Sequence, residues 1–173
     1  TSKNTLSLHD ALPIYDRQPR NGNVARLAQQ VNALAATVSG AKLPKFSCTD
    51  TSGNTVSSAE ITKAAVGVIY LWASWNYEST EMQRRLKQMK DKAGNKLCVI
   101  GFSVDAAQAS CNSFLERDSV KWSTVCDGLM FESKTVRTLG LYSIPSNILL
   151  KNGKIIERNI SSQELMRKLE ELL

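Results

Sequence analysis

The sequence predicts an α/β domain with a central, mixed but mostly parallel sheet flanked by helices. The runs VGVIYL (66–71) and LCVIGFSV (97–104) are almost continuously apolar, as expected of strands covered on both faces. Around these runs, strand-like and helix-like segments alternate along the chain. Such alternation implies right-handed crossovers and a largely parallel core.

The spacing of apolar residues and turn signals sets the order of the elements. The predicted elements are strand 66–71, helix 76–92, strand 97–104, helix 106–117, a short strand at 121–125, a helix at 133–139, strands 146–150 and 155–158, and a closing helix. Ser161 or Ser162 is predicted to cap the closing helix. Its buried side carries Leu165, Leu169 and Leu172 or Leu173.

A hairpin is predicted before this alternation begins. Between Leu43 and Val56, apolar and polar residues alternate on the two sides of the turn Asp50–Asn54, which contains Gly53. We therefore expect an N-terminal hairpin that leads into the sheet.

An extra amphipathic helix is predicted within residues 21–40. Its apolar residues recur three and four apart and end at Gly40; they are Val24, Leu27, Val31, Leu34 and Val38. Two heptads are too few for a coiled coil that stands alone in water. We expect the helix to dock on its own domain or to link to an upstream one, and self-association through Val24–Val38 is the alternative.

Residues 1–20 give no clear structural prediction. Pro13 and Pro19 interrupt a mixed segment that carries the only histidine, His9, which we interpret as an exposed spectator. The string TLSLHDALPI resembles translated sequencing-adapter sequence, so foreign sequence and native linker both stay open as interpretations. The chain thus divides into a leader (1–20), a helix or linker (21–40) and one domain (41–173).

Composition argues against several classes of function. No apolar run reaches the length of a membrane span. The net charge is +6, but the densest basic group, within 84–92, lies beside Glu81 and Asp91 and has no interleaved aromatic residues. We therefore predict a solvated helix face and no nucleic-acid partner. The four cysteines are scattered, without the close pairs that metal sites use, so we expect no metal and no cofactor.

Four segments, taken in this order, carry a family resemblance: LPKFSCTDTSGNTVSSAEI, VIYLWASW, VIGFSVD and SIPSNILLKNGKIIER. They resemble the thioredoxin superfamily, in particular the TlpA/ResA-like thiol-disulfide oxidoreductases and the related AhpC/TSA domains of bacteria. The resemblance covers about residues 41–173. It implies a thioredoxin-like fold and a periplasmic or otherwise extracytoplasmic location, although no export signal is visible in this chain.

In that family, the helix after WASW begins with a Cys-x-x-Cys pair, because a helix N-terminus stabilises the attacking thiolate. Here the equivalent tetrad is Asn76, Tyr77, Glu78 and Ser79. An amide cannot attack a disulfide and a hydroxyl cannot close one, so the sequence predicts that dithiol catalysis is lost. Asn76 is predicted to cap the helix. Ser79 lacks a base for hydrolytic chemistry, since the only histidine is His9.

The resemblance also implies a cis bond between Ile144 and Pro145, facing the active turn. Residues before this proline offer backbone groups to an extended partner, so Ser143 and Ile144 are expected to line a peptide-binding groove. Trp72, Trp75 and Tyr77 would supply its aromatic wall, with core packing the favoured interpretation of Trp72.

Among the cysteines, Cys126 is the candidate for redox chemistry. It ends a strand just before the Asp127–Gly128 turn, so an accessible thiol with a redox or disulfide function stays open as an alternative, and inert packing is the favoured interpretation. Cys98 and Cys111 are predicted to be core residues.

The function predicted from the sequence is a thioredoxin-like module that has lost dithiol catalysis and binds an extended peptide or protein. One alternative is a thiol-disulfide oxidoreductase or antioxidant protein that uses a displaced cysteine such as Cys126. Another is a structural accessory domain that associates through its N-terminal helix.

Overall fold

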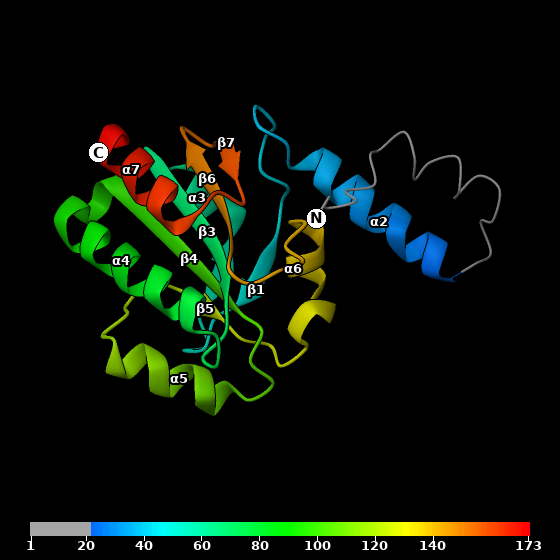
Figure 1. Cartoon of the computed structure of the whole chain (residues 1–173), viewed down its shortest axis with the longest axis horizontal. Coiled ribbons are helices and arrows are strands. Elements are labelled where there is room, and N and C mark those ends of the chain that lie inside the picture. The colour runs from blue at the N-terminus through cyan, green and yellow to red at the C-terminus, as the bar shows by residue number, and fades with distance from the viewer. Residues whose placement is uncertain (1–21) are drawn as a thin grey trace, which may run out of the picture.

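A computed structural model describes residues 22–173; the predicted leader, with His9, lies outside the described residues. The helices are α2 (Gly22–Ala36), α3 (Ser58–Thr62), α4 (Tyr77–Ala93), α5 (Gln108–Arg117), α6 (Lys134–Thr138) and α7 (Ser162–Leu172), with 3-10 turns η1 (Gly94–Lys96) and η2 (Met130–Glu132). The strands are β1 (Ser47–Thr49), β2 (Thr55–Ser57), β3 (Val66–Trp72), β4 (Leu97–Ser103), β5 (Thr124–Val125), β6 (Ser146–Lys151) and β7 (Lys154–Arg158). The chain thus follows the predicted order (Figure 1).

The central sheet is mixed, with strand order β5-β4-β3-β6-β7. β3, β4 and β5 pair in parallel, whereas β6 pairs antiparallel with both β3 and β7. Four strands therefore run one way and β6 runs against them. β1 and β2 form the predicted N-terminal hairpin as a separate two-stranded sheet.

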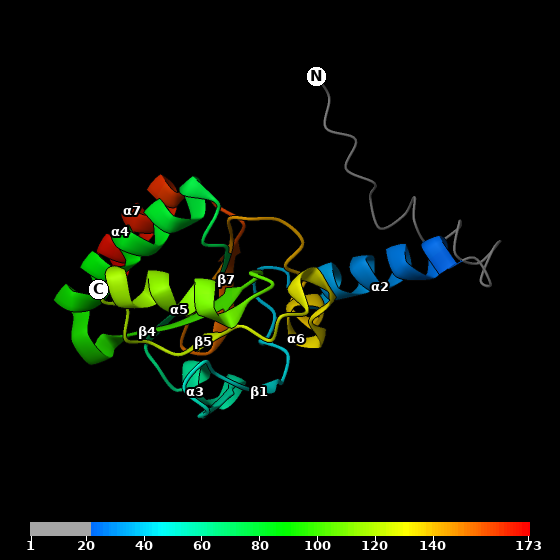
Figure 2. The ribbon, with the colours of Figure 1, turned by 90° about the horizontal axis from the view of Figure 1, so that it is seen from below.

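Helices cover both faces of the sheet, as the apolar strand runs predict. α4, α5 and α7 pack on one face through residues such as Leu86, Leu115 and Leu165. α3, α6 and the hairpin cover the other face, where Ile61 and Val136 join the core. Figure 2 shows α4, α5 and α7 together on one side of the sheet and α3 with β1 on the opposite side. Every residue of β3 is buried between these two layers.

The amphipathic helix α2 docks on its own domain. It packs against α6, with Ala28 and Val31 buried, and Arg26 forms an ion pair with Glu132. At its end, buried Thr37 accepts a hydrogen bond from Arg158 of β7. Docking thus agrees with one of the two expectations for this helix.

The structure departs from the predicted elements at several points. α5 begins at Gln108, two residues later than the predicted 106. α3 was not predicted, because a single turn directly after a strand leaves no helical period to detect. It packs closely against β3: a Cβ atom on Gly67 of β3 would lie 2.6 Å from the Ile61 side chain of α3. β5 spans only two residues, since it pairs only with Gly101 and Phe102. α6 begins one residue later and ends one residue earlier than the predicted 133–139. Within the described residues, no helix has the length and apolarity needed to cross a membrane.

Candidate functional site

The candidate site lies at one end of the sheet. The β3–β6 register pairs Leu71 with Ser146, so the turn after β3 lies beside residues 143–145. Because β4 and β5 run parallel to β3, the segments 104–107 and 126–131 leave the sheet at the same end. Four loops therefore converge there, which is where open α/β sheets place their sites.

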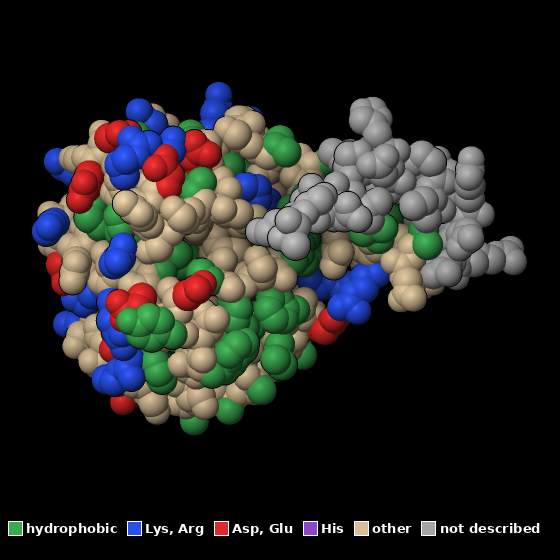
Figure 3. Space-filling model, in the orientation of Figure 1, with side chains coloured by type: hydrophobic (Ala, Val, Ile, Leu, Met, Phe, Trp, Pro, Cys, Tyr) green, Lys and Arg blue, Asp and Glu red, His purple; other side chains and the backbone are tan. Residues whose placement is uncertain are grey.

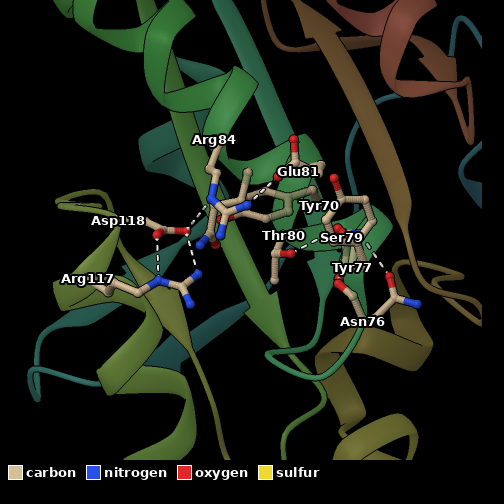
Figure 4. Close-up of polar contacts among 10 residues, drawn as sticks. Tyr70, Asn76, Tyr77, Ser79, Thr80, Glu81, Arg84, Arg117 and Asp118 are labelled. Atoms are coloured by element: carbon tan, nitrogen blue, oxygen red, sulfur yellow. Dashed lines mark hydrogen bonds and ion pairs between the residues drawn. The ribbon is translucent and has the colours of Figure 1, made fainter.

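Asn76 caps α4, as the sequence predicts. Its backbone is extended and its side-chain Oδ1 accepts a hydrogen bond from the Ser79 N–H at 2.8 Å. Figure 4 shows the two side chains together at the start of the helix. Asn76 thus satisfies one of the free amides at the start of the helix.

Ser79 is fully buried, and its hydroxyl is engaged by the turn itself. Its Oγ accepts a hydrogen bond from the Ala73 N–H at 3.2 Å and lies 3.1 and 3.0 Å from the carbonyl oxygens of Ala73 and Asn76. No imidazole lies within the described residues to activate it. The Ser79 hydroxyl therefore holds the turn closed and is unavailable as a nucleophile.

Trp75 and Tyr77 project into solvent, with 63% and 74% of their surfaces exposed. Trp72, in contrast, is completely buried and packs in the core. Leu129 and Met130, which follow β5, are also exposed, so four of the six exposed large hydrophobic residues in the described part of the chain follow strands at this end. Figure 3 shows hydrophobic side chains gathered on the visible face between α5 and α6.

The segment before β6 offers free backbone groups. The Ile144–Pro145 peptide bond is cis. Ser143 is exposed, and within residues 22–173 neither Ser143 nor Ile144 forms a backbone hydrogen bond. Trp75, Tyr77, Ser143, Ile144 and Pro145 are called the turn surface below.

A buried carboxylate that sequence reasoning missed fixes the turn from behind. Asp105, 2% exposed, accepts hydrogen bonds from the Ser74 N–H and from the hydroxyls of Ser74 and Ser103, both at 2.7 Å. These donors offset the cost of burying the carboxylate. The available signal was an aspartate directly after a buried apolar strand.

The basic group on α4 is largely engaged in ion pairs and hydrogen bonds. Arg84 pairs with Glu81 and, at 3.2 Å, with Asp118 at the end of α5, which Arg117 also contacts (Figure 4). Among the other members of the group, Lys87 pairs with Asp91, and Lys90 donates to the carbonyl oxygens of Gly94 and Leu97. Within the described residues, no group of three or more His, Cys, Asp or Glu side chains could hold a metal ion.

All four cysteines are free thiols; the structure agrees with inert packing, the favoured interpretation of Cys126, and contradicts the alternative of an accessible thiol. Cys126 is only 9% exposed, because its Sγ turns inward and donates to the carbonyl oxygen of Asp105 at 3.5 Å. Cys111 of α5 is completely buried, as predicted, and Cys126 and Ser103 lie close enough to influence its pKa. Burial raises the pKa of Cys111 to about 12 and that of half-buried Cys98 to about 11.

The chain matches the AhpC/TSA family model over residues 39–158. Among solved structures, it is similar to a thiol-disulfide oxidoreductase from Bacteroides fragilis, with 30% identity and a TM-score of 0.67 over 76% of this chain and 99% of that one. The thioredoxin domain of a thiol-disulfide oxidoreductase from Bacteroides vulgatus shares 18% identity, with a TM-score of 0.64 over 78% and 96% of the two chains. A secreted disulfide oxidoreductase from Mycobacterium tuberculosis shares 17%, with a TM-score of 0.59 over 73% and 95%. A comparison with curated proteins gave no match.

Proposed function

The chain belongs to the AhpC/TSA family, and we propose that it is a thioredoxin-like domain that has lost dithiol catalysis and binds an extended segment of another protein. The observation that carries the proposal is the turn itself. Asn76 and Ser79 occupy the positions of the two sulfurs and are engaged in capping and closing the turn. The turn surface beside them stays open to solvent.

Two kinds of group on the turn surface suit an extended polypeptide. The free backbone groups of Ser143 and Ile144 can pair with the backbone of a partner segment, as in strand addition. The exposed rings of Trp75 and Tyr77 offer apolar contact area at low cost in side-chain entropy. The partner we propose is therefore an extended peptide with apolar side chains.

Two assays test this function. In a disulfide-reduction assay with insulin, the wild-type chain should not exceed the rate of the free thiol used as reductant. In a binding assay, reduced and carboxymethylated α-lactalbumin serves as an unfolded probe. Saturable binding that weakens about tenfold in Trp75→Ala is expected, since buried aromatic anchors carry much of the energy of an interface.

Val38→Ala is the matched control, because Val38 is 49% exposed but follows α2 and is not part of the turn surface. It should leave probe binding unchanged. Reduction well above the rate of free thiol would overturn the loss of catalysis. Probe binding that is absent, or equal in wild type and Trp75→Ala, would overturn the binding role.

The second candidate function is a thiol-disulfide oxidoreductase or antioxidant activity centred on Cys126. Its position favours this candidate, since Cys126 follows β5 at the end of the sheet that carries the turn. Its burial opposes it, because a catalytic thiol must meet its substrate. Any reductase activity that Cys126→Ala removes would support this candidate over the binding function.

We further propose an extracytoplasmic location, because the similar structure from M. tuberculosis is that of a secreted protein. Fractionation of cells that express the full-length gene product tests this location, and recovery in the cytoplasmic fraction alone would contradict it.

A further inference from the structure

Two thiols that the proposed function does not use lie together in the core behind the turn. Cys111 belongs to α5 and Cys126 follows β5, and the two thiols lie close enough for Cys126 to influence the pKa of Cys111. Both side chains belong to the same apolar core, on the face that α4, α5 and α7 cover. Figures 1 and 2 both show α5 lying beside β5. We infer that Cys111 and Cys126 form an intramolecular disulfide when the chain meets a small disulfide oxidant.

The surroundings favour the oxidised form. The disulfide is uncharged and suits an apolar core, whereas desolvation holds the Cys111 thiol protonated and raises its pKa to about 12. A dithiol whose thiolates are poorly stabilised forms a disulfide that resists reduction. The bond is therefore structural in character and distinct from the labile disulfide of a catalytic Cys-x-x-Cys pair.

The order of steps follows from exposure. Cys126 retains 9% exposure and precedes the exposed residues 127–130, whereas Cys111 has none. With oxidised glutathione as oxidant, the Cys126 thiolate attacks one sulfur of the glutathione disulfide and one glutathione thiolate leaves. The Cys111 sulfur then attacks the Cys126 sulfur of the mixed disulfide, and the Cys111 proton passes to the second glutathione, which leaves as a thiol. The two protein thiols together lose two electrons, and these electrons reduce one glutathione disulfide to two glutathione molecules.

Formation of the bond should raise the thermal stability. It closes a loop whose two ends, positions 111 and 126, are 15 residues apart in the sequence. On the loop-entropy model, a loop of this length raises the melting temperature of a chain of this size by about 6 to 12 °C. The bond would also tie the segment that carries Leu129 and Met130 to α5.

The test incubates the folded, reduced full chain with oxidised glutathione and then blocks the remaining thiols. Cleavage before aspartate places each cysteine in its own fragment, because Asp50, Asp91, Asp105, Asp118 and Asp127 separate the four cysteines. Mass spectrometry of the unreduced digest should show fragment 105–117 joined to fragment 118–126. The oxidised chain should melt at the higher temperature, and dithiothreitol should reverse the shift.

Cys111→Ala and Cys126→Ala should each abolish the cross-link and the shift, whereas Cys98→Ala should retain both. Circular dichroism shows whether each variant is folded. If a variant fails to fold, the fragment map of the wild-type chain still decides the pairing. A map that joins any other pair, or stable glutathione adducts on Cys126 without a cross-link, would overturn the inference.

Discussion

Replacing Asn76 with alanine should destabilise the protein by removing the cap of α4. In the structure, Asn76 Oδ1 accepts the Ser79 N–H at 2.8 Å, and Ser79 is fully buried, so water cannot replace the lost acceptor. Cap removal costs about 0.5–2 kcal/mol, and an unpaired buried donor costs about 1–3 kcal/mol. Because both values describe the same lost bond, we expect a loss of about 1.5–2 kcal/mol in the free energy of unfolding.

Urea unfolding followed by far-UV circular dichroism measures this loss. The midpoint should fall while the slope stays constant, since the surface exposed on unfolding does not change. The melting temperature should fall by about 3 to 8 °C. Asn76→Asp keeps the acceptor and adds a negative charge at the positive end of the helix, so above pH 5 it should match or exceed wild-type stability.

The matched control is Asn95→Ala, because Asn95 is exposed and forms no side-chain hydrogen bond within the described residues. It should change stability by less than about 0.5 kcal/mol. An equal loss in Asn76→Ala and Asn95→Ala would refute the argument that the amide serves as a cap.

Three further outcomes are expected. Replacing Asn76 and Ser79 together with cysteine should produce a local disulfide that dithiothreitol reduces, detected by thiol counting; two persistent free thiols would show that the turn is not equivalent to the family's dithiol turn. The free energy of unfolding should fall as the pH rises from about 9 to about 11, because Cys98 has a pKa of about 11 in the folded chain and its thiol loses the proton first in the unfolded chain. The urea midpoints of wild type and Cys98→Ala should therefore converge over this pH range. A constant difference between the two midpoints would contradict the linkage. Leu34→Glu with Val38→Glu should leave the solution mass at that of the monomer, since α2 already docks on α6; a wild-type dimer that these changes dissociate would favour association through the helix.

Much of the fold could be predicted because its signals are local. The apolar runs at 66–71 and 97–104 became β3 and β4, and the 3-and-4 spacing from Val24 to Val38 became α2 with its connection to the domain. Helix α3 escaped prediction because one turn has no period, and the sequence did not indicate which strand of the mixed sheet runs against the others; the pairing shows that it is β6.

The candidate site was predicted in part. The cap at Asn76 and the burial of Trp72 follow from residue type and position, and both are present. The anchor at Asp105 was missed because its partner Ser74 lies 31 residues away in the chain. Inert packing of Cys126 was the favoured interpretation and agrees with its burial, but its hydrogen bond to Asp105 could not be predicted because Asp105 belongs to a neighbouring strand end.

The sequence by itself determined that the turn lacks sulfur, because the identity of residues 76 and 79 needs no coordinates. It also determined the order of strands and helices, since hydrophobic periodicity and capping act over a few neighbouring residues. Only the tertiary structure decided which distant side chains meet. The parallel pairing of β4 with β5 and the packing of α5 bring Cys111 close to Cys126, and proximity across fifteen residues depends on strand order and helix packing, which no local pattern encodes.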